Sequence, residues 1–159
     1  MKKAAIYAGT FDPITLGHLD LIRRASGIFD RLVVAALGTP SAKKTMFDIA
    51  TRLEMIRESI SEMERVEVES FDGLLVDYAR SKGIEVIVRG LRAYSDFDFE
   101  FQMALSNRKL DPGVETIFLM PNEEFSYVSS SIVREIMHLG GDIGSFVPPA
   151  VVRIAGHGA

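Results

Sequence analysis

The chain of 159 residues contains no cysteine. That absence excludes disulfide bonds, thiolate catalysis and zinc sites built from cysteine, and it fits a cytoplasmic enzyme. Long hydrophobic runs are missing as well. The apolar stretch 4–8 directly follows Met1, Lys2 and Lys3, and it is too short for a signal peptide or a membrane span. We therefore expect a cytoplasmic protein that is neither exported nor bound to a membrane.

A strong net charge is also lacking. The 18 lysines and arginines nearly balance the 22 acidic residues, and the formal charge is −4. Such a chain has no overall field that attracts nucleic acid or an anionic membrane, so we expect neither as a partner. With 47% apolar and 25% charged residues and no repeat, linker or low-complexity segment, the sequence predicts one globular domain over residues 1–159.

Short apolar runs alternate with longer segments of helical period, which is typical of βαβ units on a parallel sheet. The runs predict five strands, at residues 4–8, 32–37, 66–70, 85–89 and 116–120. Helices are predicted from about Gly17, over 48–63, 74–82, 95–109 and 130–139, and after Pro148 and Pro149. With right-handed crossovers, this order predicts an α/β fold: a doubly wound, Rossmann-like five-stranded parallel sheet with helices on both faces.

Two unusual loops, 9–18 and 90–95, follow the first and fourth predicted strands. In a doubly wound sheet these strands are neighbours at the switch point, where ligands bind beyond the carboxyl ends of strands. Gly9 allows backbone to approach a ligand, and Gly17 opens a helix whose free N–H groups favour a phosphate. His18 follows at once. The pattern is neither a P-loop nor the G-x-G-x-x-G fingerprint.

The stretch from Thr15 to His18 resembles the (T/H)-x-G-H signature of the nucleotidyltransferase superfamily, and the longer stretch 7–13 is similar to the phosphopantetheine adenylyltransferase family. Further matches follow in order at 43–47, 89–92, 96–107 and 129–131. The resemblance implies transfer of the adenylyl group of ATP to 4′-phosphopantetheine, giving dephospho-coenzyme A and pyrophosphate without a covalent intermediate. Family members commonly carry Pro, Trp and Ile where this chain has Ala8, Phe125 and Val128, exchanges that keep apolar or aromatic character.

Histidine at a helix start often only bonds nearby backbone. The resemblance instead implies that His18 contacts the α-phosphate in the transition state and that Thr10 orients the acceptor phosphate. Lys43 is either a solvated loop lysine or, as the resemblance implies, a ligand of the acceptor or transferring phosphate; its neighbour Lys44 is the alternative for that role.

Arg89 and Arg92 flank Gly90 at the end of the fourth predicted strand. Two guanidinium groups there can grip several phosphate oxygens, and a charge that ends a buried strand requires an anion. The resemblance implies that Arg89 serves the acceptor and Arg92 the triphosphate.

Other site residues come from the same resemblance. For ATP they are Gly9, Thr10, Phe11, Gly17, His18, Arg89, Gly90, Arg92, Glu100, Ser129, Ser130 and Ser131, and the resemblance implies that Glu100 lies near the ribose. For the acceptor they are Thr10, Lys43, Asp72, Leu74, Leu75, Arg89 and Asn107. The serines also fit a helix cap.

The chemistry implies Mg²⁺ held mainly by the ATP phosphates and water, with no metal ligand from the protein. The resemblance further implies a homohexamer, a dimer of trimers, and possible feedback by coenzyme A. Two alternatives stay open at this point. One is a related nucleotidyltransferase that uses nicotinate mononucleotide or glycerol phosphate as acceptor, and the other is a non-catalytic nucleotide sensor.

Overall fold

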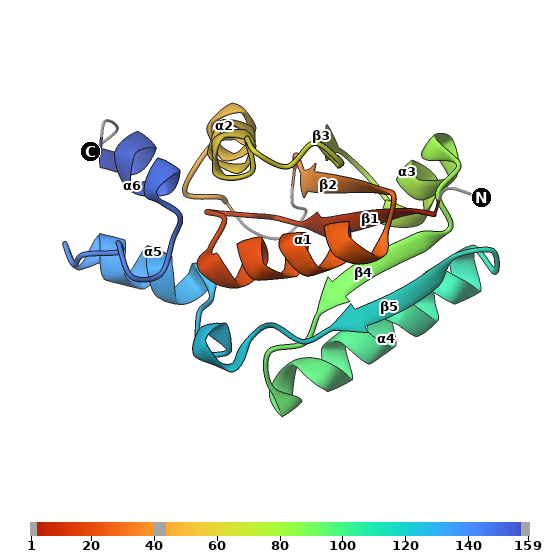
Figure 1. Cartoon of the computed structure of the whole chain (residues 1–159). Coiled ribbons are helices and arrows are strands. Elements are labelled where there is room, and N and C mark those ends of the chain that lie inside the picture. The colour runs from red at the N-terminus through yellow and green to blue at the C-terminus, as the bar shows by residue number, and fades with distance from the viewer. Residues whose placement is uncertain (1–2, 40–43, 157–159) are drawn as a thin grey trace.

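The structure, a computed structural model, describes residues 3–39 and 44–156, without the side chains of Tyr94 and Ser95. All five predicted strands are present. They are β1 (Ala4–Gly9), β2 (Arg31–Leu37), β3 (Val66–Phe71), β4 (Val86–Gly90) and β5 (Glu115–Leu119), and every pair is parallel. The sheet order is β3-β2-β1-β4-β5 (Figure 1). Because β1 and β4 are neighbours, the predicted switch point and the predicted fold class are confirmed.

Helices connect the strands close to the predicted ranges. They are α1 (Leu16–Ile28), α2 (Ile49–Ser59), α3 (Leu75–Lys82), α4 (Tyr94–Leu110), α5 (Ser130–His138) and α6 (Pro149–Gly156). Asp48 caps α2 by accepting from the backbone N–H of Thr51 at 2.8 Å. Gly83 ends α3 in a left-handed conformation at φ 63° that glycine adopts readily.

Two local features differ from the sequence-based expectation. Helix α2 ends at Ser59, before the predicted Met63. Ile60 and Met63 still pack in the core, from a turn in which Met63 N–H donates to Ile60. The apolar periodicity therefore continues past the true helix end. A short 3₁₀ helix, η1 (Glu123–Phe125), was not predicted.

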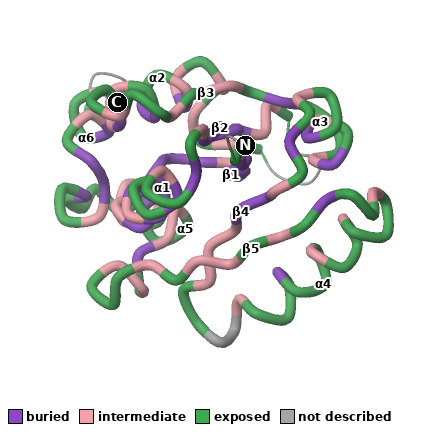
Figure 2. Tube along the Cα trace, turned by 45° about the vertical axis from the view of Figure 1, so that its right-hand side comes forward, coloured by how far each residue is buried: buried purple, intermediate pink, exposed green. Residues whose placement is uncertain are grey.

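Each central strand is buried on both faces. In β1, Ala5 and Tyr7 join one core cluster, to which α1 and α2 contribute, while Ile6 and Ala8 join a second cluster with α3. This alternation follows from the two-residue period of a strand, and it explains the continuous apolar runs. Helix α4 packs against β5 and α3, and it is exposed along most of its length (Figure 2). Within the described ranges, no helix is long and apolar enough to cross a bilayer.

Candidate active site

A cleft of about 670 Å³ opens at the carboxyl ends of β1 and β4 and at the N-terminal ends of α1 and α5. It brings together every residue predicted to contact ATP: Gly9, Thr10, Phe11, Gly17, His18, Arg89, Gly90, Arg92, Glu100, Ser129, Ser130 and Ser131. These residues come from four separate segments of the sequence. The topology collects them at the switch point, as expected for a doubly wound sheet.

The predicted acceptor residues are distributed differently. Thr10 and Arg89 line the cleft, whereas Lys43 lies outside the described residues, and its neighbour Lys44 is part of the lining. Four others do not line the cleft: Asp72, Leu74, Leu75 and Asn107. The Asp72 carboxylate accepts from the backbone N–H of Thr39 at 2.9 Å, Leu75 packs against the core, and the carbonyl of Asn107 holds the end of α4.

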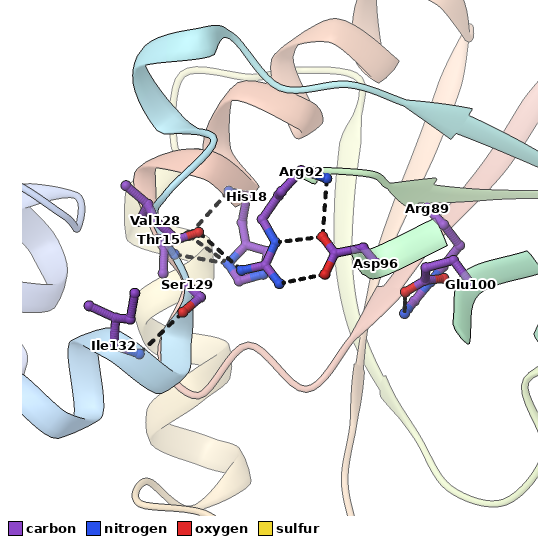
Figure 3. Close-up of polar contacts among 9 residues, drawn as sticks. All are labelled: Thr15, His18, Arg89, Arg92, Asp96, Glu100, Val128, Ser129 and Ile132. Carbon is purple, nitrogen blue, oxygen red and sulfur yellow. Dashed lines mark hydrogen bonds and ion pairs between the residues drawn. The ribbon is translucent and has the colours of Figure 1, made fainter. Parts of the chain in front are cut away.

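His18 is fixed at the start of α1 by a reciprocal cap with Thr15. The backbone N–H of Thr15 donates to Nδ1 of His18 at 3.0 Å, and the backbone N–H of His18 donates to Oγ1 of Thr15 at 3.3 Å (Figure 3). The contact with nearby backbone that is common for a histidine at a helix start is therefore present in His18. Because Nδ1 accepts a hydrogen bond, the proton of the neutral ring lies on Nε2. His18 is therefore an N–H donor at its other nitrogen.

The surroundings of His18 keep the ring neutral. Burial, together with the positive charges of Arg92 and Arg89, lowers the pKa of His18 to about 3. The Phe11 ring packs edge-on against the imidazole, with centroids 5.0 Å apart. Phe11 is buried and has a left-handed backbone at φ 50°, an unusual conformation for a bulky residue. Strain of this kind is found where a loop must hold a side chain in place.

Arg89 lies at the end of β4, and the anion that neutralises its charge is a carboxylate of the same chain. Its Nε and Nη2 donate to the two carboxylate oxygens of Glu100 at 2.8 and 2.6 Å (Figure 3). Its Nη1 donates to the carbonyl of Ala8 at 2.7 Å. Burial opposes the charge of Arg89, but the hydrogen bonds and charge of Glu100 more than offset it, so the pKa of Arg89 stands above its ordinary value. Glu100, predicted near the ribose, is also the partner that orients this guanidinium.

Arg92 is held in a similar way but is more exposed. Its backbone N–H and Nε donate to Oδ2 of Asp96 at 3.1 and 3.2 Å, and Nη1 donates to the carbonyl of Val128 at 3.2 Å. Figure 3 shows Arg92 between the Asp96 carboxylate and the end of the chain segment that carries Val128 and Ser129. Asp96 was not predicted as a site residue. Its position four residues after Arg92, in the first turn of α4, is the signal that could have identified it.

The three serines stand at the start of α5. Ser129 caps the helix by accepting from the backbone N–H of Ile132 at 3.2 Å, and Ser130 donates its hydroxyl to the carbonyl of Pro13 at 2.8 Å. Ser131 accepts from Nη2 of Arg134 at 3.2 Å. The predicted cap is therefore present, and the positive end of the helix dipole faces the cleft as well.

Arg134 is a cleft residue that sequence reasoning missed. It lies one helical turn after Ser131, lines the cleft, and donates from Nη1 to the carbonyl of Asp12 at 2.7 Å. A basic residue one turn into a helix that opens with serines was the available signal. Together with Arg89, Arg92 and Lys44, it gives the cleft four basic side chains against three acidic ones, Asp12, Asp96 and Glu100. The lining is therefore net positive although the chain is acidic overall, which fits binding of a polyanion.

The described residues of this cleft do not form a binding site for a metal ion. Within residues 3–39 and 44–156, no group of three or more potential metal-ligating side chains occurs. The acidic groups of the lining are engaged: Asp12 accepts from two backbone amides, Asp96 pairs with Arg92, and Glu100 pairs with Arg89. These residues do not fit a resident metal ion, so Mg²⁺ is considered below only as a companion of the substrate ATP.

Comparison with known proteins identifies the class. A family model described as "Cytidylyltransferase-like" matches residues 6–136, from β1 into α5. The fold is also that of a solved structure from Vibrio parahaemolyticus described as a nicotinate-nucleotide adenylyltransferase, with a TM-score of 0.69 over 97% of this chain and 91% of that one. At 21% sequence identity, this likeness bears on the fold alone.

Curated relatives narrow the class. A phosphopantetheine adenylyltransferase of Methylococcus capsulatus is 57% identical over 93% of this chain and 91% of its own length. One of Alkaliphilus metalliredigens is 52% identical over 95% of this chain and 96% of its own length. The chain therefore belongs to the phosphopantetheine adenylyltransferase family, within the cytidylyltransferase-like proteins.

Proposed function

We propose that this protein transfers the adenylyl group of ATP to 4′-phosphopantetheine, releasing pyrophosphate and dephospho-coenzyme A. The main support for this reaction is the cleft itself, where a neutral histidine, three arginines and a helix N-terminus surround one space of about 670 Å³. Adenylyl transfer brings a triphosphate and a phosphate monoester together and develops negative charge on phosphoryl oxygens, and this lining supplies fixed N–H donors for that charge.

In the proposed reaction, a phosphate oxygen of the acceptor attacks the α-phosphorus of ATP. The bond from the α-phosphorus to the oxygen that bridges to the β-phosphate breaks, and pyrophosphate leaves with that electron pair. His18 donates a hydrogen bond from Nε2 to an α-phosphate oxygen and gives up no proton. Thr10 orients the attacking phosphate, and no covalent enzyme intermediate forms.

In this proposal, different arginines bind different phosphate groups of the two substrates. Arg89, oriented by Glu100, serves the acceptor phosphate, while Arg92 and the serines at the start of α5 serve the β- and γ-phosphates. Arg134 lies beside Ser131 and adds positive charge on the same side. Mg²⁺ enters bound to the ATP phosphates and water.

Self-association is part of the proposal as well. Large apolar side chains are exposed along α4 and on β5 and the residue after it, among them Phe97, Phe99, Phe101, Met103, Leu105, Ile117 and Met120. An exposed apolar surface of this kind marks a protein interface. It supports self-association, and the homohexamer built from two trimers stays a prediction from the family resemblance. Feedback by coenzyme A and a cytoplasmic location stay predictions from the sequence.

An acceptor panel tests the proposal. Pyrophosphate release from magnesium ATP is measured with 4′-phosphopantetheine, nicotinate mononucleotide and glycerol 3-phosphate. Turnover with 4′-phosphopantetheine alone is expected. Turnover with another acceptor would preserve the phosphate chemistry and overturn the substrate, and no turnover with any acceptor would favour the nucleotide sensor.

A further inference from the structure

Arg52, on the first turn of α2, is a buried arginine that none of the assigned roles uses. Only 1% of it is exposed, yet it forms no ion pair with any carboxylate in the described part of the chain. Its guanidinium group donates instead to four backbone carbonyls. Nη1 donates to Thr10 at 2.7 Å and to Leu37 at 2.9 Å, Nη2 to Gly38 at 3.1 Å, and Nε to Phe47 at 3.1 Å.

Stability alone is a poor explanation for this arginine. Burial lowers the pKa of Arg52, and the charges of Asp12 and Asp48 only partly compensate. Replacement of buried charges by well-packed apolar groups is often neutral or stabilising. What an apolar side chain cannot do is bind several carbonyls at once, because only the guanidinium carries five N–H donors in a fixed planar fork.

Carbonyls that Arg52 binds belong to two segments that line the cleft. Thr10 follows β1, and Phe47 closes the segment that includes the cleft residue Lys44. From the other direction, the Asp12 carboxylate accepts from the backbone N–H of Phe47 at 2.9 Å and of Met46 at 2.8 Å. Phe47 is therefore held at both its carbonyl and its amide, by two charged side chains that also fix the loop after β1.

We propose that Arg52 is a positioning residue for the acceptor phosphate. It fixes the Thr10 backbone and the base of the segment bearing Lys44 relative to each other, so that both can engage one phosphate. This inference rests on the proposed function, and it assumes that Thr10 and Lys44 bind the acceptor. Thr10 is assigned to both substrates. The other groups assigned to ATP lie at the ends of β1 and β4, in the loops after these strands and on α1, α4 and α5, and Arg52 donates a hydrogen bond to none of them.

The test is the kinetics of Arg52→Lys. Lysine retains the positive charge, but its single ammonium group cannot reproduce the planar fork of the guanidinium group and so cannot bind the same four carbonyls. Misplacement of a substrate-binding group by about 1 Å costs on the order of 100-fold in rate, so we expect kcat/KM for 4′-phosphopantetheine to fall by roughly 10- to 100-fold. The Kd for ATP, measured by calorimetry, is expected to change less than about threefold. A role in folding alone would not separate the two substrates.

Two further variants complete the design. Arg57→Lys changes an exposed arginine on the same helix, whose contact with the Val68 carbonyl is long at 3.4 Å, and it should behave like the parent protein. Asp12→Asn weakens the second hold on Phe47, because one of its two accepting oxygens becomes an amide donor. Arg134, on the ATP side, loses only a 3.8 Å ion pair with this carboxylate and keeps its 2.7 Å hydrogen bond to the Asp12 carbonyl. The variant should therefore show the same acceptor-specific loss, and it serves as the test if Arg52→Lys does not fold.

The outcomes separate the two proposals. Loss confined to the acceptor in Arg52→Lys, or in Asp12→Asn, supports the positioning role. Unchanged kinetics, or equal loss for both substrates, overturns it. If the parent protein itself does not adenylate 4′-phosphopantetheine, then the proposed function fails first, and this result is visible before any variant is compared.

Discussion

The paired charges of Arg89 and Glu100 make the substitution Glu100→Gln informative. Glu100 is 9% exposed and binds the guanidinium through both of its oxygens. Removing one member of a buried ion pair costs ~3–5 kcal/mol. Glutamine keeps one accepting oxygen and Ala8 keeps its bond to Arg89, so we expect a smaller loss, about 2–3 kcal/mol in the free energy of unfolding.

The same substitution should increase the response to a bound anion. Without the carboxylate, the positive charge of Arg89 is uncompensated, and a phosphate group can take its place. Inorganic pyrophosphate is the suitable probe, because it has no ribose and so avoids the ribose contact expected of Glu100. We expect saturating pyrophosphate to raise the melting temperature of Glu100→Gln by more than it raises that of the parent protein.

Urea denaturation and thermal melts, each with and without pyrophosphate, measure both effects. Asp98→Asn is the matched control, since it neutralises an exposed carboxylate on the same helix and changes the net charge equally. The reasoning is refuted if Glu100→Gln is as stable as Asp98→Asn, or if pyrophosphate stabilises the two variants equally.

Three further predictions follow from the cleft. The pKa of His18 is about 3, below its ordinary 6.5, so the NMR signals of its ring in the ligand-free protein should not titrate from about pH 5 to 8. The contribution of His18 to the free energy of unfolding should be full above pH 6.5 and decline as the pH falls toward 3. A titration midpoint near pH 6.5 would contradict this prediction. Gly90→Ala places a methyl group against Leu21 and should cost about 1–3 kcal/mol in urea denaturation; an unchanged midpoint would contradict it. Alanine at Lys43 and at Lys44, tested singly, should raise the acceptor KM more for Lys43, as the resemblance implies, and the reverse order would assign the role to Lys44.

The fold could be predicted because its signals are local. Five short apolar runs separated by helical segments leave few topologies once crossovers are right-handed, and the order places β1 beside β4. The end of α2 could not be found this way, because Ile60 and Met63 continue the helical apolar pattern from within a turn.

The cleft residues were accessible to sequence reasoning where they occur in motifs, but their partners were not. Nothing adjacent to Arg89 indicates that Glu100 will neutralise it, since the pairing depends on how α4 packs beside β4. Arg52 gave no signal at all: an arginine in an amphipathic helix is normally solvated, and only the tertiary structure shows its four carbonyl partners. Long-range polar contacts have no sequence period, so they emerge only with the fold.

The most direct test of the account is the chemical step in His18→Ala. Rapid-quench measurement of a single turnover of ATP with 4′-phosphopantetheine, together with the Kd for ATP, separates catalysis from binding. Loss of one transition-state donor should lower the rate of the step by roughly 10²–10³-fold and leave the Kd for ATP within about threefold of the parent value. A single-turnover rate equal to that of the parent protein would remove His18 from the mechanism and contradict the account.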